Sequence, residues 1–323
     1  MYDILSIGDC VLDTLLLIDK AQIRYGKKGH RPEALCLSYA DKIAIAKAVQ
    51  SLGGNAANFA VGAKKLGTKV AIMSQIGEDI NGRMIQEGLK KKNVDTTYLT
   101  LGRNLQTRYS IVLNYDTERT VLSNHPKHRY IFPEMPQTKW VYYTSLGEGF
   151  ERLQKKLRSW IHKHPNVHLA MNPGSYMLKH GVVAIKEILQ DLDVLFVNKE
   201  EAEHILQIKA PVQTLLKKFW SLGVDIPVIT DGARGSYAYQ NGEYFFMPIF
   251  PVKPIAKTGA GDAFAAGFIS ALIFKKEVKE ALEWGTANAA GVIQKFGAQE
   301  GILNKKDIQK LLKKYPKQRA IRM

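Results

Sequence analysis

The sequence predicts an α/β protein: a three-layer sandwich with helices on both faces of a parallel sheet, and a small β-rich lid over one edge. Three observations lead to this prediction. Short β-rich runs alternate with amphipathic helical stretches along much of the 323-residue chain. A hydrophobic content of 46% is enough to bury a large core. Two turn-rich excursions, about 13–45 and 98–125, interrupt the alternation and predict the lid.

The core elements follow one another in chain order. Apolar β-rich runs predict strands at 4–7, 70–76, 140–144, 168–172, 194–198 and 228–230. Apolar residues at helical spacing predict helices at 56–66, 82–91, 150–164, 182–189 and 213–222. The lysine-rich tail, 305–322, predicts a closing surface helix. Strands that alternate with helices in this way are expected to lie parallel in one sheet.

The lid prediction depends on the second excursion, where 109–115 and 120–123 predict a hairpin outside the main sheet. The chain has no internal repeat, low-complexity tract or Pro/Gly linker that would divide it. We therefore expect a single domain over 1–323, with the lid formed by about 13–45 and 98–125.

The net charge is +16, from 46 Lys and Arg against 30 Asp and Glu. Such an excess invites a nucleic-acid or anionic ligand. However, the lysines are spread widely, and several lie on the polar faces of predicted helices, where lysine is an ordinary solvated residue. A basic nucleic-acid-binding protein is therefore kept only as a remote alternative, and we expect no nucleic-acid partner.

Cysteine content and hydropathy limit the cellular setting. The chain has two cysteines, Cys10 and Cys36, in no CxxC spacing, which argues against a disulfide framework or a zinc ribbon. No apolar run approaches the roughly 18 residues of a membrane span, and the N-terminus has no signal-peptide pattern. We expect a cytoplasmic protein with no membrane partner.

The sharpest local motif is the run Lys257-Thr-Gly-Ala-Gly-Asp262, which precedes an apolar helical stretch. Its small residues let backbone N–H groups converge at the positive end of the following helix, which predicts an anion site. Asp262 lies where a phosphate would be repelled. A carboxylate beside an anion hole suits phosphoryl transfer, in which Asp262 takes the proton of an attacking hydroxyl. The alternative is that Asp262 is an ordinary helix-capping residue.

A second motif, Ser51-Leu-Gly-Gly-Asn-Ala-Ala-Asn58, leads into the first predicted helix. Gly53 and Gly54 permit close backbone approach, and Asn58 is an amide suited to sugar hydroxyls. A plain strand-to-helix turn explains the same residues. The common fingerprints of other nucleotide-binding proteins are absent, including the GxxxxGK[ST] P-loop, GxGxxG after the first strand, and the protein-kinase HRD and DFG motifs.

Taken together, the motifs resemble those of the ribokinase/PfkB carbohydrate kinase family. The first family signature matches from Gly53 through Asn58 to Gly77, and the C-terminal signature matches over 259–268. Between them, 198–201 fits the family's N-x-x-E, and 230–235 fits its strand-turn nucleotide loop. The resemblance covers essentially the whole chain and implies the ribokinase-like fold.

The resemblance implies a role for each matching residue. Asp262 would be the general base, and Gly259, Ala260 and Gly261 would form the anion hole. Asp13, Gly53, Gly54 and Asn58 would hold the acceptor, with Glu148 as a further candidate. Asn198 and Glu201 would organise Mg²⁺ near the triphosphate. The ATP side would be lined by Thr230, Gly232 and Gly235, with Asn288, Gly297 and Ala298 near the adenine.

The chain departs from the family pattern just before the anion loop. Many members have Asp-Thr-Thr there, and the Asp helps to bind a monovalent cation; here the first two positions are Ala256 and Lys257. We hypothesise that the Lys257 ammonium replaces K⁺, so that K⁺ is not required. A solvated loop lysine is the alternative.

The lid also departs from the family pattern. Residues 20–40 are longer and more basic than a minimal lid, with His30, Arg31 and Cys36, although Cys36 and His30 alone are too few for a metal site. On the lid strands, Arg108 and Arg119 could meet an anionic acceptor, but arginines there are more often solvated.

The leading hypothesis is an ATP- and Mg²⁺-dependent kinase that phosphorylates a hydroxyl of a sugar or sugar-like small molecule. A nucleoside kinase of the same family is the first alternative, and a phosphosugar kinase is a weaker one. In this family the lids of two subunits can pair, so the resemblance makes a homodimer through the lid possible. The sequence leaves the acceptor and the attacked hydroxyl open.

Overall fold

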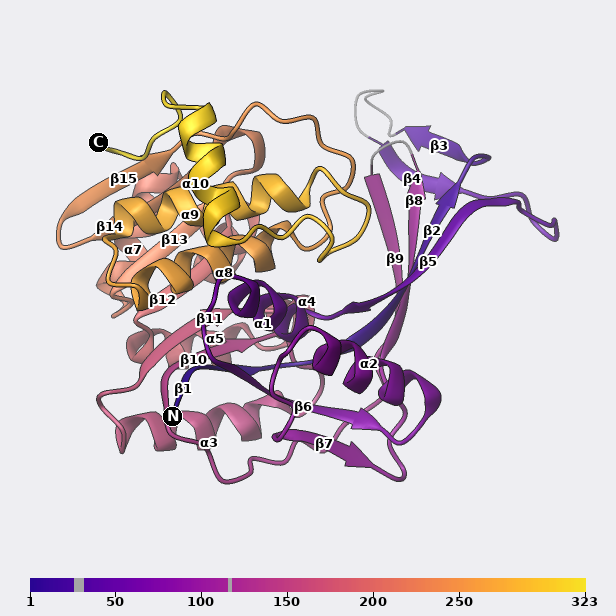
Figure 1. Ribbon diagram of the computed structural model, residues 1–323, viewed down its shortest axis with the longest axis horizontal. Helices are drawn as coiled ribbons and strands as arrows, with labels where there is room; N and C mark the ends of the chain where they lie inside the picture. Colours follow the sequence, from indigo (N-terminus) through magenta and orange to yellow (C-terminus); the bar gives the residue numbers. More distant parts are fainter. Residues whose placement is uncertain (26–31, 116–117) are drawn as a thin grey trace.

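The computed structural model describes residues 1–25, 32–115 and 118–323, and its core is a ten-stranded sheet between two layers of helices (Figure 1). In spatial order the strands are β16 (Ile321–Arg322), β15 (Glu243–Met247), β14 (Ser236–Gln240), β13 (Ile226–Thr230), β12 (Val194–Asn198), β11 (His168–Asn172), β10 (Thr138–Thr144), β1 (Tyr2–Ile7), β6 (Val70–Gly77) and β7 (Leu99–Gly102). The strands from β13 to β7 are parallel, and β14, β15 and β16 are antiparallel additions at one edge.

Helices cover both faces of this sheet. One face packs against α1 (Asn55–Lys65), α2 (Ile80–Lys91), α8 (Ala260–Ile273), α9 (Val278–Val292) and α10 (Lys305–Lys314). The other packs against α3 (Phe150–His162), α4 (Ser175–His180), α5 (Val182–Ile188), α6 (Lys199–Leu206) and α7 (Val212–Ser221), with short 3₁₀ turns at Leu189–Asp191 and Gly232–Arg234.

Successive side chains of each strand point to opposite faces of the sheet and so belong to two separate apolar cores. In β10, Tyr142 joins the core under α1 and α8, while Val141 and Tyr143 join the core under α3. Strands buried on both faces are continuous apolar runs, which is why the sequence predicts them well.

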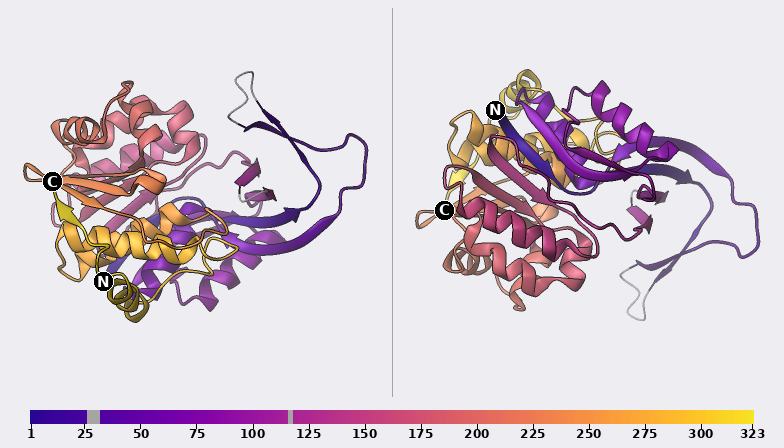
Figure 2. Two further views of the ribbon diagram at one scale, coloured as in Figure 1. Left: turned by 90° about the horizontal axis from the view of Figure 1, so that it is seen from above. Right: turned by 90° about the horizontal axis from the view of Figure 1, so that it is seen from below.

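A separate small sheet forms the lid. It contains β5 (Ile45–Gly53), β2 (Val11–Ile18), β8 (Tyr109–Tyr115) and β9 (Glu118–Asn124), in that order, and is followed outward by the hairpin β3 (Gln22–Tyr25) and β4 (Pro32–Cys36). Figures 1 and 2 show the lid projecting from one end of the core. Within the part of the chain that the structure describes, no helix is long and apolar enough to span a bilayer.

The predicted α/β sandwich with a small β-rich lid is confirmed, and its boundaries need correction. The lid extends beyond the predicted 13–45, because it begins at Val11 and includes all of β5. Conversely, β7 lies within the predicted 98–125 but pairs with β6 in the large sheet. His30 and Arg31 lie outside the described residues.

Candidate active site

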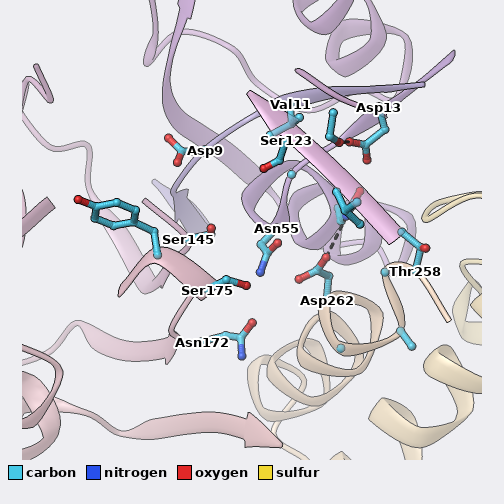
Figure 3. Close-up of a pocket in the computed structure, with 18 of the residues that line it drawn as sticks. Asp9, Val11, Asp13, Asn55, Ser123, Ser145, Asn172, Ser175, Thr258 and Asp262 are labelled. Atoms are coloured by element: carbon cyan, nitrogen blue, oxygen red, sulfur yellow. Dashed lines mark hydrogen bonds between the residues drawn. The ribbon is translucent and has the colours of Figure 1, made fainter. Parts of the chain in front are cut away.

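A cavity of about 580 Å³ lies between the inner face of the lid and the carboxyl ends of the central strands. In open α/β sheets, ligands bind at this end of the strands. Of the residues that the sequence singles out, the cavity is lined by Asp13, Gly54, Asn58, Arg108, Arg119, Asn198, Glu201, Thr230, Lys257, Gly259, Ala260, Gly261 and Asp262. In Figure 3, Asp13, Asn55 and Asp262 surround a common space, with Ser145, Asn172 and Ser175 on the other wall.

The anion loop is the N-terminus of α8. Gly259 caps the helix in the left-handed region, with φ of 79°, and no side chain caps it. A Cβ at Gly259 would lie 2.7 Å from Ala298 Cβ, so the loop passes too close to its neighbour for any other residue. Of the predicted anion-hole residues, Ala260 donates its N–H to the Lys257 carbonyl at 3.4 Å, while the N–H groups of Gly259, Gly261 and also Asp262 have no partner among the described residues. These free donors, at the positive end of a helix, are suited to an anion.

Asp262 is buried beside this loop, with 7% of its surface exposed. Burial raises its pKa to about 7, with a smaller contribution from nearby Asp13, while the hydrogen bond from Asn58 and the charge of Arg119 oppose the rise. A carboxylate with a pKa near neutrality is poised to accept a proton at physiological pH.

Asn58 holds the Asp262 carboxylate in place. Its Nδ2 donates to Asp262 Oδ2 over 2.9 Å, and its Oδ1 accepts from Gln299 Nε2, also over 2.9 Å. Gln299 donates in addition to the carbonyl of Leu52 at 3.0 Å, which fixes the direction of the Asn58 amide. Asn58, expected to hold acceptor hydroxyls, therefore uses both ends of its amide within the protein. Gln299 itself is a residue that the sequence analysis did not identify.

Asp13 lies on β2 in the inner face of the lid and is buried. Its carboxylate accepts a hydrogen bond from the Ser110 hydroxyl of β8. Burial raises the pKa of Asp13, although the Ser110 hydrogen bond and the charge of Arg119 oppose that rise. A Cβ at Gly53 would lie 1.9 Å from Asp13 Oδ2, so Gly53 makes room for the carboxylate and does not line the cavity itself.

Asn198 and Glu201 form a capping box at the start of α6. The Asn198 side chain accepts from the Glu201 N–H at 2.8 Å, and Glu201 Oε2 accepts from the Asn198 N–H at 2.9 Å. Burial raises the pKa of Glu201. The second carboxylate oxygen of Glu201 is not used in the box, and the residue lines the same cavity as Asp262.

This donor set fits Mg²⁺. Within the described residues no group of three or more His, Cys, Asp or Glu side chains could hold a metal ion. Mg²⁺ is usually bound by one or two carboxylates together with waters and substrate phosphates, so a single carboxylate facing a phosphate site is sufficient.

A second, more open hollow of about 340 Å³ adjoins the first. Asn198 and Thr230 line both hollows, and Gly232 lines the second. Gly235 ends the turn with φ of 100°, and a Cβ added there would lie 2.4 Å from the Met247 carbonyl oxygen. Its role is therefore to close the turn between β13 and β14.

Asn288, Gly297 and Ala298, which were expected near the adenine, line neither of these two hollows. Asn288 is fully buried, donates to the Ala263 carbonyl at 2.7 Å and accepts from the Leu303 N–H at 2.9 Å. It therefore joins α8 to α9 and to the loop before α10. Ala298 packs against Gly259 and supports the anion loop from behind.

Glu148, a candidate for binding the acceptor, does not line the cavity, although Ser145, Leu146 and Gly147 do. Its side chain is about half exposed and pairs with Lys127 at 2.8 Å. Lys257 lines the cavity mouth, where its ammonium lies 2.5 Å from Glu118 Oε1 of the lid strand β9.

The two lid arginines differ. The expectation that Arg108 is solvated is wrong: it is 1% exposed and forms an ion pair with Asp9. Arg119 is exposed, lines the cavity and has no ion pair among the described residues. Its charge opposes the rise in the pKa of both Asp13 and Asp262, as expected for a cation in the same cavity as these two carboxylates.

Several polar lining residues were not identified from the sequence, namely Asp9, Asn55, Ser110, Ser123, Ser145, Asn172 and Ser175. All of them lie within three residues of a strand end, on one side of it or the other, and this position is the signal that could have found them. Many hydroxyl and amide groups around one cavity suit a polyhydroxylated ligand.

Comparisons with known proteins agree with this geometry. A family model described as pfkB family carbohydrate kinase matches residues 30–305. Ribokinase of Haemophilus influenzae is 27% identical over 270 residues, covering 80% of this chain and 87% of that protein. The 5-dehydro-2-deoxygluconokinase of Bacillus subtilis is 23% identical over 287 residues, covering 81% and 86%.

Solved structures share the fold. Arabidopsis thaliana ribokinase complexed with ribose and ATP has a TM-score of 0.77 at 21% identity, with 97% of this chain and 99% of that chain covered. A nucleoside kinase of Methanocaldococcus jannaschii has a TM-score of 0.76 at 23% identity, with 97% and 99% covered.

Proposed function

Because the chain belongs to the pfkB family of carbohydrate kinases, we propose that it transfers the γ-phosphoryl group of ATP to a hydroxyl of a sugar or sugar-like small molecule. Its family relatives are phosphotransferases that act on sugar hydroxyls, and the chain is a phosphotransferase with an alcohol group as acceptor. One observation supports the proposed chemistry above all: the buried Asp262 carboxylate lies beside free backbone donors in the cavity that also contains Asp13.

In the proposed reaction, Asp262 takes the proton of the acceptor hydroxyl as its oxygen attacks the γ-phosphorus. The bond from that phosphorus to the bridging oxygen breaks, and ADP leaves with the electron pair. The N–H groups of Gly261 and Asp262, at the positive end of α8, stabilise the phosphoryl oxygens. Because Asn58 donates to Asp262, the carboxylate stays directed into the cavity.

Asp13 would bind the acceptor hydroxyls from the lid side, next to Ser110. The nucleotide would extend from the anion loop past Asn198 and Thr230 into the second hollow at Gly232, since the first two residues line both spaces. Glu201, with the Asn198 side chain, would hold Mg²⁺, which when bound neutralises charge on the triphosphate.

A nucleoside kinase is the second candidate. Val112 and Val121 of the lid and Tyr176 of α4 line the cavity, and these apolar groups could cover a base. An anionic acceptor such as 5-dehydro-2-deoxygluconate would instead use the charge of Arg119, which lines the cavity.

A panel of ribose, fructose, 5-dehydro-2-deoxygluconate, adenosine, guanosine and cytidine, each with ATP and Mg²⁺, tests the proposal. Acceptor-dependent ADP formation with a phosphorylated product supports it. No transfer to any member, together with salt-dependent binding to DNA or RNA, would favour the nucleic-acid alternative.

The oligomeric state and the cellular location are two further expectations for this enzyme. We propose that two lids could pair into a homodimer, since Leu122 of β9 and Ile45 of β5 are about half exposed on the lid strands. Sedimentation of the whole chain and of a Leu122→Lys variant tests this. The cytoplasmic location stays a prediction.

A further inference from the structure

A buried ion pair lies at the junction of the lid and the core. Asp9 lies two residues after β1 and two residues before the lid strand β2, while Arg108 lies one residue before the lid strand β8. They are 4% and 1% exposed, and Arg108 NH1 donates to Asp9 Oδ2. The Leu12 N–H donates to the Arg108 carbonyl at 3.1 Å, so backbone pairing of β2 with β8 begins at the same place.

Tyr130 extends this pair into a cluster. Its hydroxyl donates to Asp9 Oδ1 at 3.1 Å and accepts from Arg108 NH2 at 2.8 Å and from the Gly147 N–H at 2.6 Å. A Cβ at Gly147 would lie 2.7 Å from Arg108 NH2, so the loop after β10 fits closely against the guanidinium. The cluster therefore connects the start of the lid to the cavity wall.

The chain passes between the core and the lid four times, and all four connections lie at this cluster. Asp9 precedes β2, Arg108 precedes β8, and Arg108 NH2 lies 3.4 Å from the carbonyl oxygen of Pro126, just after β9. The fourth crossing is Gly54, just after β5. It has φ of 87°, and a Cβ there would lie 2.4 Å from the Asp9 carbonyl oxygen. A movement of the lid on the core must therefore disturb contacts of Asp9 or Arg108.

A buried ion pair is weak evidence for stability, because desolvation of both charges offsets their attraction, and a well-packed apolar pair often does as well. What the fork of an arginine adds is fixed geometry. Here that geometry determines where β8 lies against β2, and two residues further along β8 the Ser110 hydroxyl donates to Asp13.

On the basis of the proposed kinase function, we propose that Asp9, Arg108 and Tyr130 form a lid clamp: positioning residues that hold the lid strands at one angle to the core and so place Asp13 over the acceptor. Asp9 and Arg108 also line the cavity, but each is held by partners within the protein. In this proposal the clamp acts by setting the position of β2 and β8, and with them Asp13, and by keeping the lid close to the cavity.

Two consequences distinguish this role from general stability. A loosened clamp weakens acceptor binding while the ATP side, on β12, β13 and α8, keeps its affinity. A loosened lid also admits water, whose oxygen then attacks the γ-phosphorus in place of the acceptor oxygen, so that ADP and inorganic phosphate form without product.

The test compares Tyr130→Phe and Arg108→Lys with Arg103→Lys, a control on an exposed arginine whose partner Glu78 is 3.9 Å away. Tyr130→Phe keeps the ring and removes only the hydroxyl, so it serves if Arg108→Lys does not fold. Amide hydrogen exchange of the ligand-free protein is measured first. Steady-state kinetics follow, with the panel acceptor that the wild type phosphorylates fastest.

We expect both clamp variants to speed exchange in β2, β8 and β9 by about tenfold, with β12 and β13 unchanged. The acceptor KM should rise about tenfold, the ATP KM should change less than about twofold, and more phosphate should be released per product formed. Unchanged lid exchange, or an equal rise in exchange throughout the chain, would overturn the clamp. If the wild type phosphorylates no panel member, the proposed function fails, and the exchange measurement still decides on the clamp.

Discussion

Asn58 Nδ2 donates a 2.9 Å hydrogen bond to Asp262 Oδ2, which joins the motif before α1 to the motif before α8, 204 positions apart in the chain. The Asn58 amide is itself oriented by Gln299. The motif around Asn58 therefore contributes a partner for the proposed base and not only a glycine turn, and the pH behaviour of the enzyme should depend on this contact.

The kcat/KM of the wild type should decrease on the acid side of its pH profile, with a midpoint near pH 7. Asp262 accepts a proton only when ionised, and burial raises its pKa to about 7, so the active fraction falls as the pH falls below that value. We expect kcat/KM for the acceptor to drop about tenfold per pH unit well below the midpoint and to level off above it. A pH profile from 5 to 9 measures this, and a flat profile across that range would exclude Asp262 as the titrating group.

Asn58→Ala should move that midpoint upward. The amide hydrogen bond favours the ionised carboxylate, so its removal raises the pKa of Asp262 further. We expect a shift of about one pH unit, with a smaller loss of rate at the alkaline plateau. A profile that keeps its wild-type midpoint and loses rate equally at all pH values would show that Asn58 acts on the acceptor instead.

The two glycines of the anion loop should respond differently to alanine. At Gly259 the positive φ and the 2.7 Å approach to Ala298 make a side chain strained, and Gly259→Ala should cost about 1 kcal/mol or more of folding stability. At Gly261 a Cβ meets nothing within 4 Å, so Gly261→Ala should fold normally while its methyl group occupies phosphate space. Denaturant unfolding and ATP binding by calorimetry separate the two effects. Equal losses of stability would contradict this account of the loop.

K⁺ should not be needed for activity. Ala256 has no side-chain oxygen at the position where a cation carboxylate is expected, and the Lys257 ammonium lies on the same loop, held near Glu118. Rates in KCl and in tetramethylammonium chloride at equal ionic strength should agree, also in Glu118→Gln, where Lys257 is released from its partner. A several-fold increase with K⁺ in the wild type would rule out this hypothesis.

The central strands and the anion loop could be predicted from the sequence because their signals are local. Strands buried on both faces are continuous apolar runs, and the loop before α8 needs small residues at fixed spacing. By contrast, β5 is a lid strand of mostly exposed small and polar residues, and its pairing with β2, not its own composition, makes it a strand.

Other parts of the site depend on contacts between distant positions. Arg108 is buried because Asp9, 99 residues away, lies beside it, and no pattern near Arg108 indicates this. Glu148 follows a central strand as expected, but a bond to Lys127 directs it to solvent. The Asn288 amide bonds Ala263 of α8 and Leu303 before α10, and no pattern in the residues around Asn288 indicates these partners.

Phosphoryl transfer by Asp262→Asn tests the central claim most directly. The substitution keeps the size of the side chain and removes the proton acceptor, so product formation from ATP and the fastest panel acceptor should fall by about 10²–10⁴-fold, the usual contribution of a general base. ATP binding, measured by calorimetry in the same preparation, should persist, because the free N–H groups of the loop remain. Full phosphoryl transfer by the asparagine variant would contradict the assignment of Asp262 as the base.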